Sequence, residues 1–139
     1  MASGIVHKRD WVPSELIRRF IERNSDGRSG AINIFIGHVK RSGVKGDVKA
    51  LYLEAYEEVA SEELRRIADE VRERYGLNDV EICHAVGEFG VGEPIVYVAI
   101  AAPSRKNMYE AMKAAIEGYK TRPPIFKKEI YSDGSSEWI

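Results

Sequence analysis

The sequence has almost no cysteine and almost no net charge, and each absence argues against a class of protein. Cys83 is the only cysteine among 139 residues. An internal disulfide, a CxxC redox motif and a cysteine zinc site are therefore not expected, and a small buried residue in a strand is the simplest interpretation. The formal net charge is −1, whereas a general nucleic-acid binder needs a basic face that displaces phosphate counterions. Any anion site must therefore be local.

Long apolar runs are missing as well. No run approaches the length that spans a bilayer, and residues 1–10 lack the apolar core of a signal peptide. We therefore expect a cytoplasmic protein with no membrane partner. The length and the composition, with 44% hydrophobic and 31% charged residues, suit a single globular domain over residues 1–139.

Several catalytic motifs are also absent from the sequence. It contains no Gly-x-Ser-x-Gly elbow, no Walker A loop and no Cys-His pairing with a recognisable spacing. The three histidines are scattered, so we expect neither a metal site nor a cofactor. A lone strand histidine such as His84 is more often a structural hydrogen-bonding residue. Glycines 87, 90 and 92 lack the spacing of a nucleotide loop and are interpreted as turn residues.

The periodicity of the apolar residues predicts three helices and at least four strands. Helices are expected from a Ser14 N-cap to near Asn24, over 57–75 with Gly76 as the C′ glycine, and after Pro103 with Ser104 as N-cap. Strands are expected over 31–39, 48–55, 80–84 and 95–102, with a hairpin over 129–139. Strands come in adjacent pairs instead of alternating with helices, which favours an α+β fold with a largely antiparallel sheet.

Four cations surround a rigid step near the end of the chain, in the run Tyr-Lys-Thr-Arg-Pro-Pro-Ile-Phe-Lys-Lys-Glu over residues 119–129. Pro123 and Pro124 restrict φ and cannot continue a helix, so Lys120 and Lys127 are held on a restricted path. Cations in a fixed geometry suit an anionic substrate. An ordinary basic surface loop is the alternative that the local sequence leaves open.

Two further cationic groups lie at expected element ends. Arg105 and Lys106 are expected in the first turn of the third helix, where acidic residues are usual; a bound anion would make two cations favourable there, and solvated side chains are the alternative. His38, Lys40 and Arg41 follow a strand end, which is a rigid place for a site. Such a set of cations can bind phosphate, and a desolvated lysine among them can supply an amine for acid, base or covalent chemistry.

The same residues resemble the large, catalytic subunit of molybdopterin synthase, the MoaE family. The resemblance runs from about residue 28 to the C-terminus and is carried by Gly37-His38-Val39-Lys40, Leu53-Glu54-Ala55-Tyr56, Ile82-Cys83-His84-Ala85-Val86-Gly87, Gly92-Glu93, Pro103-Ser104-Arg105-Lys106 and the run at 119–129. It implies a fold of the α/β-hammerhead type. It also implies sulfur transfer to cyclic pyranopterin monophosphate, which forms the dithiolene of molybdopterin.

The resemblance implies partners too. In that family the sulfur arrives as a thiocarboxylate on the C-terminal Gly-Gly of a small ubiquitin-like carrier, and the large subunit forms a homodimer within a heterotetramer. The chain ends in Trp138-Ile139, so we expect the acceptor side of this pair. Two alternatives are a non-catalytic dimeric module that binds the carrier or a phosphate ligand, and a sensor of phosphate compounds.

Position by position, the resemblance implies that Lys120 and Lys127 are the catalytic pair. One amine would attack the thiocarboxylate carbonyl or accept the acyl end, and the other would stabilise negative charge and donate protons. Arg105 matches a residue that binds substrate across the dimer interface, and Arg122 is expected to be structural. The pocket wall is expected to include Lys128 and Glu129, and the further substrate-binding positions are His38, Lys40, Arg41 and Ser104.

Three positions depart from the family pattern. Ser104 replaces a histidine, and a hydroxyl can cap a helix or bind phosphate but does not titrate near neutrality. Lys40 replaces an arginine and loses its bidentate fork, although Arg41 stands beside it. Ala85 replaces a common arginine. These changes affect the roles of individual residues more than the reaction.

Overall fold

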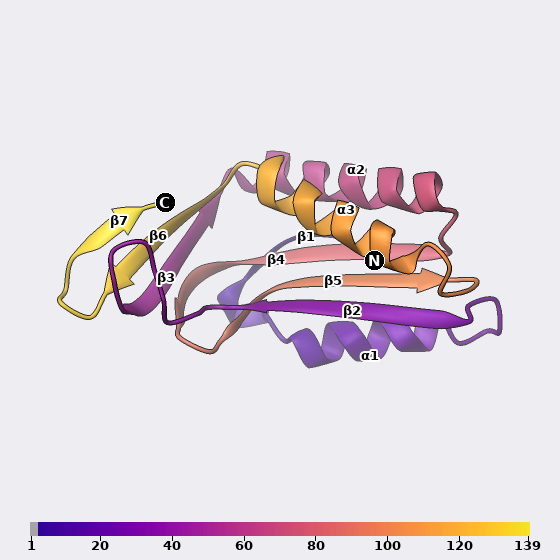
Figure 1. Cartoon of the computed structure of the whole chain (residues 1–139), viewed down its shortest axis with the longest axis horizontal. Coiled ribbons are helices and arrows are strands. Elements are labelled where there is room, and N and C mark those ends of the chain that lie inside the picture. Colours follow the sequence, from indigo (N-terminus) through magenta and orange to yellow (C-terminus); the bar gives the residue numbers. More distant parts are fainter. Residues whose placement is uncertain (1–2) are drawn as a thin grey trace.

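The computed structural model describes residues 3–139, in which a seven-stranded sheet has two helices on one face and one on the other (Figure 1). The elements, in chain order, are β1 (Gly4–His7), the 3₁₀ helix η1 (Lys8–Asp10), α1 (Pro13–Arg23), β2 (Ala31–His38), β3 (Val48–Ala55), α2 (Glu57–Tyr75), β4 (Asp79–Gly90), β5 (Pro94–Ala102), α3 (Met108–Thr121), β6 (Ile125–Tyr131) and β7 (Ser136–Trp138). Within these residues, no helix is both long and apolar enough to cross a bilayer.

Strand β4 joins the two parts of the sheet. Its first half pairs with β5, which pairs in turn with β2, and its last residues from Gly87 pair with β3, which leads to β6 and β7. β1 runs parallel to β4, and every other strand pair is antiparallel. The predicted α+β fold with a largely antiparallel sheet and three α-helices is confirmed.

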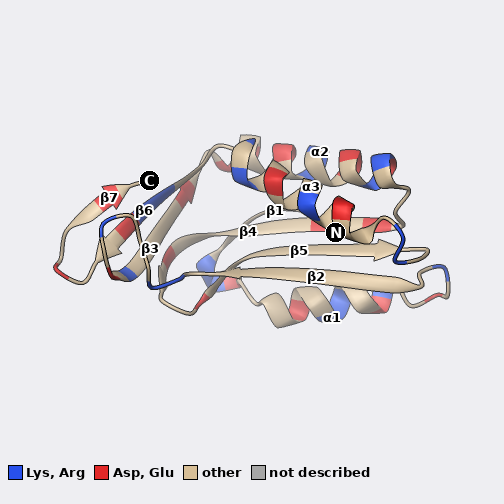
Figure 2. Ribbon diagram, in the orientation of Figure 1, with Lys and Arg blue, Asp and Glu red and all other residues tan. Residues whose placement is uncertain are grey.

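Apolar stripes place the helices on the sheet. α2 buries Ala60, Leu64, Ile67, Ala68 and Val71 against the face that it shares with α3. On the opposite face, α1 packs Phe20 against the strand residues Cys83, Tyr97, Ala99 and Ala101. Charged residues lie mainly on the helices, on the loops and on the β3–β6–β7 end, whereas β2 and β5 carry none (Figure 2). The predicted buried position of Cys83 in a strand is confirmed.

The predictions for β3 and α2 are confirmed to the residue. Gly76 follows α2 with φ 64° and ψ 42°, the left-handed conformation in which glycine has no Cβ penalty. Other boundaries were wrong. Ser14 lies inside α1 instead of capping it, because the helix begins at Pro13 after Val12. Gly87 and Gly90 belong to β4 instead of a turn, and Gly92 alone of the three lies in the turn.

Two strands differ from the predicted pattern. β1 was not predicted, and it pairs with residues 83–86 of β4. β6 begins at Ile125, directly after the two prolines, so the final hairpin is longer than the predicted segment 129–139. β6 therefore presents Lys127 from a strand paired with β3, where Lys127 lies opposite Leu53.

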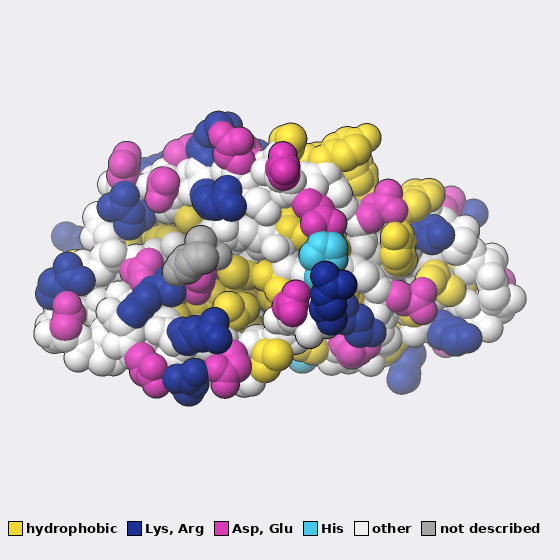
Figure 3. Space-filling view, turned by 180° about the vertical axis from the view of Figure 1, so that it is seen from behind, with side chains coloured by type: hydrophobic (Ala, Val, Ile, Leu, Met, Phe, Trp, Pro, Cys, Tyr) yellow, Lys and Arg dark blue, Asp and Glu magenta, His cyan; other side chains and the backbone are white. Residues whose placement is uncertain are grey.

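Exposed apolar side chains gather where β3 runs into α2, at the upper rim of the rear view (Figure 3). Tyr56, Val59 and Phe126 are 69%, 61% and 41% exposed. The rings of Tyr56 and Phe126 meet edge to face with their centroids 5.6 Å apart. An exposed apolar group of this kind is a candidate contact surface for another protein.

Candidate active site

A cavity of about 310 Å³ opens where the end of β2 and the end of α3 meet the inner face of β6. Its base is apolar and its wall carries three lysines. The lining residues are Phe35, Gly37, His38, Val39, Lys40, Val48, Leu51, Ile95, Val96, Tyr119, Lys120, Lys127, Glu129 and Ile139. Four of the predicted site residues, His38, Lys40, Lys120 and Lys127, therefore share one cavity.

The Pro-Pro step places the two catalytic candidates in this cavity. Lys120 belongs to the last turn of α3 and Lys127 to β6, and Pro123 and Pro124 lie between the two elements. Side chains of a strand alternate between its two faces. Lys127 and Glu129 consequently face the cavity, and Lys128 faces away from it.

The two lysines influence each other electrostatically. Burial lowers the pKa of Lys127, and the nearby positive charge of Lys120 lowers it further. Among the salt bridges of residues 3–139, none involves Lys40, Lys120 or Lys127. An anion that enters the cavity therefore meets three amines that form no ion pair with a carboxylate of the described residues. A desolvated lysine beside a second cation is typical of functional sites.

Glu129 ties the loop that carries Lys40 to β6. Its buried carboxylate accepts hydrogen bonds from the Val44 N–H at 2.9 Å and from the Tyr131 hydroxyl at 2.7 Å. Gly43 lies so close to this carboxylate that an added Cβ would stand 2.7 Å from Glu129 Oε1. The hydrogen bond to Glu129 raises the pKa of the Tyr131 hydroxyl to about 12. Sequence reasoning placed Glu129 in the pocket wall but missed its role as the anchor of this loop.

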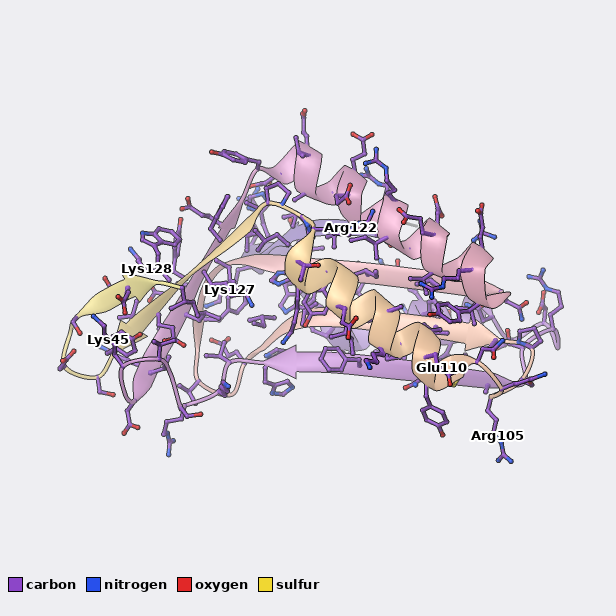
Figure 4. The ribbon with its side chains drawn as sticks, turned by 45° about the horizontal axis from the view of Figure 1, so that its top comes forward. Lys45, Arg105, Glu110, Arg122, Lys127 and Lys128 are labelled. Carbon is purple, nitrogen blue, oxygen red and sulfur yellow. The ribbon has the colours of Figure 1, made fainter. Side chains whose placement is uncertain are left out.

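Lys128 and Arg41 lie outside the cavity lining. The Lys128 Nζ stands 5.5 Å from the ring centroid of Tyr52 and 5.3 Å from that of Trp138, on the outer face of β6. Arg41 continues the loop, and its carbonyl accepts a hydrogen bond from the Val48 N–H at 2.8 Å. Figure 4 shows how Lys127 and Lys128 leave neighbouring positions of β6.

Ser104 and Arg105 lie at the other end of α3 from the cavity, as Figure 4 shows for Arg105. The 14 residues of α3 separate its ends by about 21 Å, so one chain does not bring Arg105 to Lys120. The predicted placement of Arg105 and Lys106 in the first helical turn was wrong, because α3 begins at Met108 with Asn107 as N-cap. Ser104 does not cap the helix either; its Oγ accepts a hydrogen bond from the Lys106 N–H at 3.3 Å.

Arg122 belongs to the packing of the helices and not to the cavity. Its Nε lies 2.7 Å from Glu63 Oε2, and its terminal nitrogens lie 2.8 and 3.1 Å from the two carboxylate oxygens of Glu70. Both acids belong to α2, so this guanidinium joins the end of α3 to α2. These ion pairs support the predicted structural role of Arg122, which stays a prediction.

An aromatic row forms the base of the cavity, which sequence reasoning did not anticipate. The Phe35 and Tyr119 ring centroids are 6.4 Å apart, and Tyr119 meets His84 edge to face at 5.8 Å. Burial raises the pKa of Tyr119 to about 12. The available signal was the helical stripe that ends at Tyr119, directly before Lys120. Residues 3–139 contain no group of three or more His, Cys, Asp or Glu residues arranged to hold a metal ion.

Comparisons with known proteins agree with this fold and cavity. The family model described as MoaE protein matches residues 6–122. The molybdopterin synthase catalytic subunit of Thermoplasma volcanium is 33% identical over 133 residues, 96% of this chain and 94% of that protein. The corresponding subunit of Bacillus subtilis is 39% identical over 120 residues, 86% of this chain and 75% of that protein.

A solved structure is similar over nearly the whole chain. The crystal structure of molybdopterin synthase from Staphylococcus aureus has a TM-score of 0.85 and 33% sequence identity, and the match covers 99% of this chain and 96% of that one. The predicted α/β-hammerhead type of α+β fold is confirmed by this likeness. The family predicted from the sequence motifs is confirmed as well, and the chain belongs to the MoaE family.

Proposed function

We propose that this chain transfers sulfur from the thiocarboxylate of a small carrier subunit to cyclic pyranopterin monophosphate, forming the dithiolene of molybdopterin. The predicted enzyme class, molybdopterin synthase, is confirmed by relatives that match most of the chain. The observation that carries the proposal is the cavity in which Lys120 and the desolvated Lys127 lie together. The proposed site of action is the cytoplasm.

The two lysines take different parts in this proposal. A lowered pKa brings the Lys127 amine closer to the pH of the reaction, which favours general acid and base catalysis. Lys127 therefore moves the protons of the transfer. Lys120, which is exposed at the end of α3, contacts the acyl end of the carrier and stabilises the negative charge that develops there. A dithiolene contains two sulfur atoms, so the cycle runs twice for each product.

The substrate phosphate is assigned to the cationic rim of the cavity. His38, at the end of β2, and Lys40, on the loop that Glu129 anchors, line this rim, and Arg41 follows them. Lysine binds phosphate as a point charge and does not need the bidentate geometry of arginine, so Lys40 is suited to this role. Lys128 faces the opposite side of β6, and we leave it out of the proposed site.

We also propose that two copies pair through β2 and complete each other's site. In the described sheet β2 has one neighbour, β5, and its outer edge runs over Ala31–His38 without a charge or a proline (Figure 2). Natural proteins usually protect such an edge by covering it, by pairing it or by adding charge. An antiparallel pair of β2 strands is two-fold symmetric, as homodimers usually are.

This pairing would bring Arg105 to the cavity of the second copy. Arg105 belongs to the end of the molecule where β2 begins, because the Gly30 N–H donates to the Ala102 carbonyl at 2.9 Å. The cavity lies at the other end of β2, around His38. Antiparallel pairing places these two ends side by side, so Ser104 and Arg105 of one copy would face Lys120 of the other. With one carrier on each copy, the assembly is a heterotetramer.

The experiment is a conversion assay with purified components. The chain is mixed with cyclic pyranopterin monophosphate and with the carrier, either thiocarboxylated or carrying an ordinary carboxylate. We expect molybdopterin with the first carrier and none with the second. Carrier binding without product would favour the non-catalytic module, and equally tight binding of simple nucleotides and the pterin precursor would favour a phosphate sensor.

A further inference from the structure

His84 is a buried imidazole directly behind the cavity, and the proposed reaction does not use it. It is 1% exposed and lies in β4, opposite Ile5 of β1 and Val96 of β5. Both strand neighbours are apolar. The groups that face it from other elements are the Tyr119 ring of α3 and the positive charge of Lys127 of β6.

The surroundings of His84 determine its charge and its tautomer. Its Nδ1 lies 2.9 Å from the Ala85 carbonyl oxygen, and because a carbonyl only accepts, the proton resides on Nδ1. Burial, together with a smaller contribution from the positive charge of Lys127, lowers the pKa of His84 to about 4. The imidazole is therefore neutral at physiological pH. Because the ring is neutral, it adds no positive charge to the repulsion between Lys120 and Lys127.

The position of His84 links it to the desolvation of Lys127. Lys127 is half-buried, and burial is the largest cause of the lowered pKa of its amine. Lys127 and Tyr119 line the same cavity, and His84 meets the Tyr119 ring edge to face from outside that lining. A small side chain at position 84 would leave a space behind the Tyr119 ring, next to the cavity that Lys127 lines, and water could then approach the Lys127 amine from behind.

We propose that His84 is a positioning residue for Lys127, a neutral wall that excludes water behind the cavity and keeps the Lys127 amine desolvated. Bulk and neutrality are the two properties that this role requires. Phenylalanine has both, alanine lacks the bulk, and glutamine brings its own polar groups. The consequence for turnover rests on the proposed function, whereas the effect on the amine is a property of the chain itself.

The test measures how readily the Lys127 amine reacts with trace acetic anhydride as a function of pH, followed by mass spectrometry of the labelled peptides. Lys128 is the internal control, because it is the next residue of the same strand and faces away from the cavity. In the wild type we expect Lys127 to titrate below the ordinary range of a lysine. In His84→Ala and His84→Gln the Lys127 midpoint should rise by on the order of one pH unit, and in His84→Phe it should stay in place.

An unchanged Lys127 midpoint in His84→Ala and His84→Gln would overturn the proposal. So would an equal rise in His84→Phe, because the phenyl ring keeps the wall dry. If His84→Ala does not fold, as judged by circular dichroism, the comparison of Gln with Phe decides in the same way. The pH profile of sulfur transfer provides a second readout. Its acid limb should move to higher pH in His84→Gln and stay in place in His84→Phe. Absence of turnover in the wild type as well would contradict the proposed function, and the amine titration would still decide the role of His84.

Discussion

Replacing Glu129 with alanine tests how the cavity wall is held. Glu129 is 7% exposed and joins the Val44 N–H and the Tyr131 hydroxyl. A hydrogen bond to a charged group contributes about 1.5–3 kcal/mol. Val44 is exposed and its N–H can bind water after the substitution, whereas Tyr131 is 4% exposed and its hydroxyl loses a partner. We therefore expect Glu129→Ala to lower the free energy of unfolding by about 3 kcal/mol.

The measurement is urea unfolding followed by circular dichroism, together with the rate of sulfur transfer. Glu129→Gln keeps an oxygen acceptor and should cost about 1 kcal/mol. Glu117→Ala, on the exposed surface of α3, is the matched control and should change the free energy of unfolding by less than about 0.5 kcal/mol. Because the anchored loop carries Lys40, sulfur transfer should fall more in Glu129→Ala than in the control. Equal stability of Glu129→Ala and the wild type would refute this account of the loop.

Three further predictions concern acid stability, helix packing and the dimer. The pKa of His84 is about 4 in the folded protein and 6.5 ordinarily, so the unfolded chain binds more protons between these pH values. The free energy of unfolding, measured by urea unfolding at each pH, should therefore fall by up to about 3 kcal/mol from pH 6.5 to 4. An equally steep fall in His84→Phe would show that His84 is not the cause. Arg122→Ala should cost about 1 kcal/mol or less, because solvent screens its two partly exposed ion pairs; a large loss of sulfur transfer at full stability would instead place Arg122 in the site. Asn33→Lys, near the middle of β2, should juxtapose like charges across the proposed two-fold axis and give monomers in sedimentation; an unchanged dimer would place the interface elsewhere.

Local patterns made part of the fold predictable. α2 has a regular apolar stripe and a C′ glycine, and β3 lies between clear turn signals, so both could be bounded from the sequence alone. β1 could not, because four residues of strand are stabilised by pairing with β4, almost eighty positions away. The start of α3 was misplaced because residues 103–107 are all exposed. The side chains of that segment bury little surface, so a good capping residue at Ser104 did not start a helix there.

The part of the candidate site that could be predicted from the sequence is the part held by rigid backbone. The Pro-Pro step predicted that Lys120 and Lys127 are placed together, and they share the cavity. Lys128 was assigned to the same wall because it flanks Lys127 in a segment that was not predicted to be a strand. Once residues 125–131 form a strand, alternation directs Lys128 to the other face. The distance from Arg105 to the cavity depends on where α3 begins and ends, which the local pattern did not define.

The central claim is that Lys120 and Lys127 carry out sulfur transfer, and the most direct measurement is single-turnover formation of molybdopterin by Lys120→Ala and Lys127→Ala with thiocarboxylated carrier. Lys128→Ala is the matched control, because Lys128 lies on the same strand and faces away from the cavity. We expect both cavity variants to fold normally and to lose at least a hundredfold in rate, in the range typical of a lost acid–base or oxyanion-stabilising group. The control should remain within about twofold of the wild type. Near-normal turnover in both cavity variants would contradict the account.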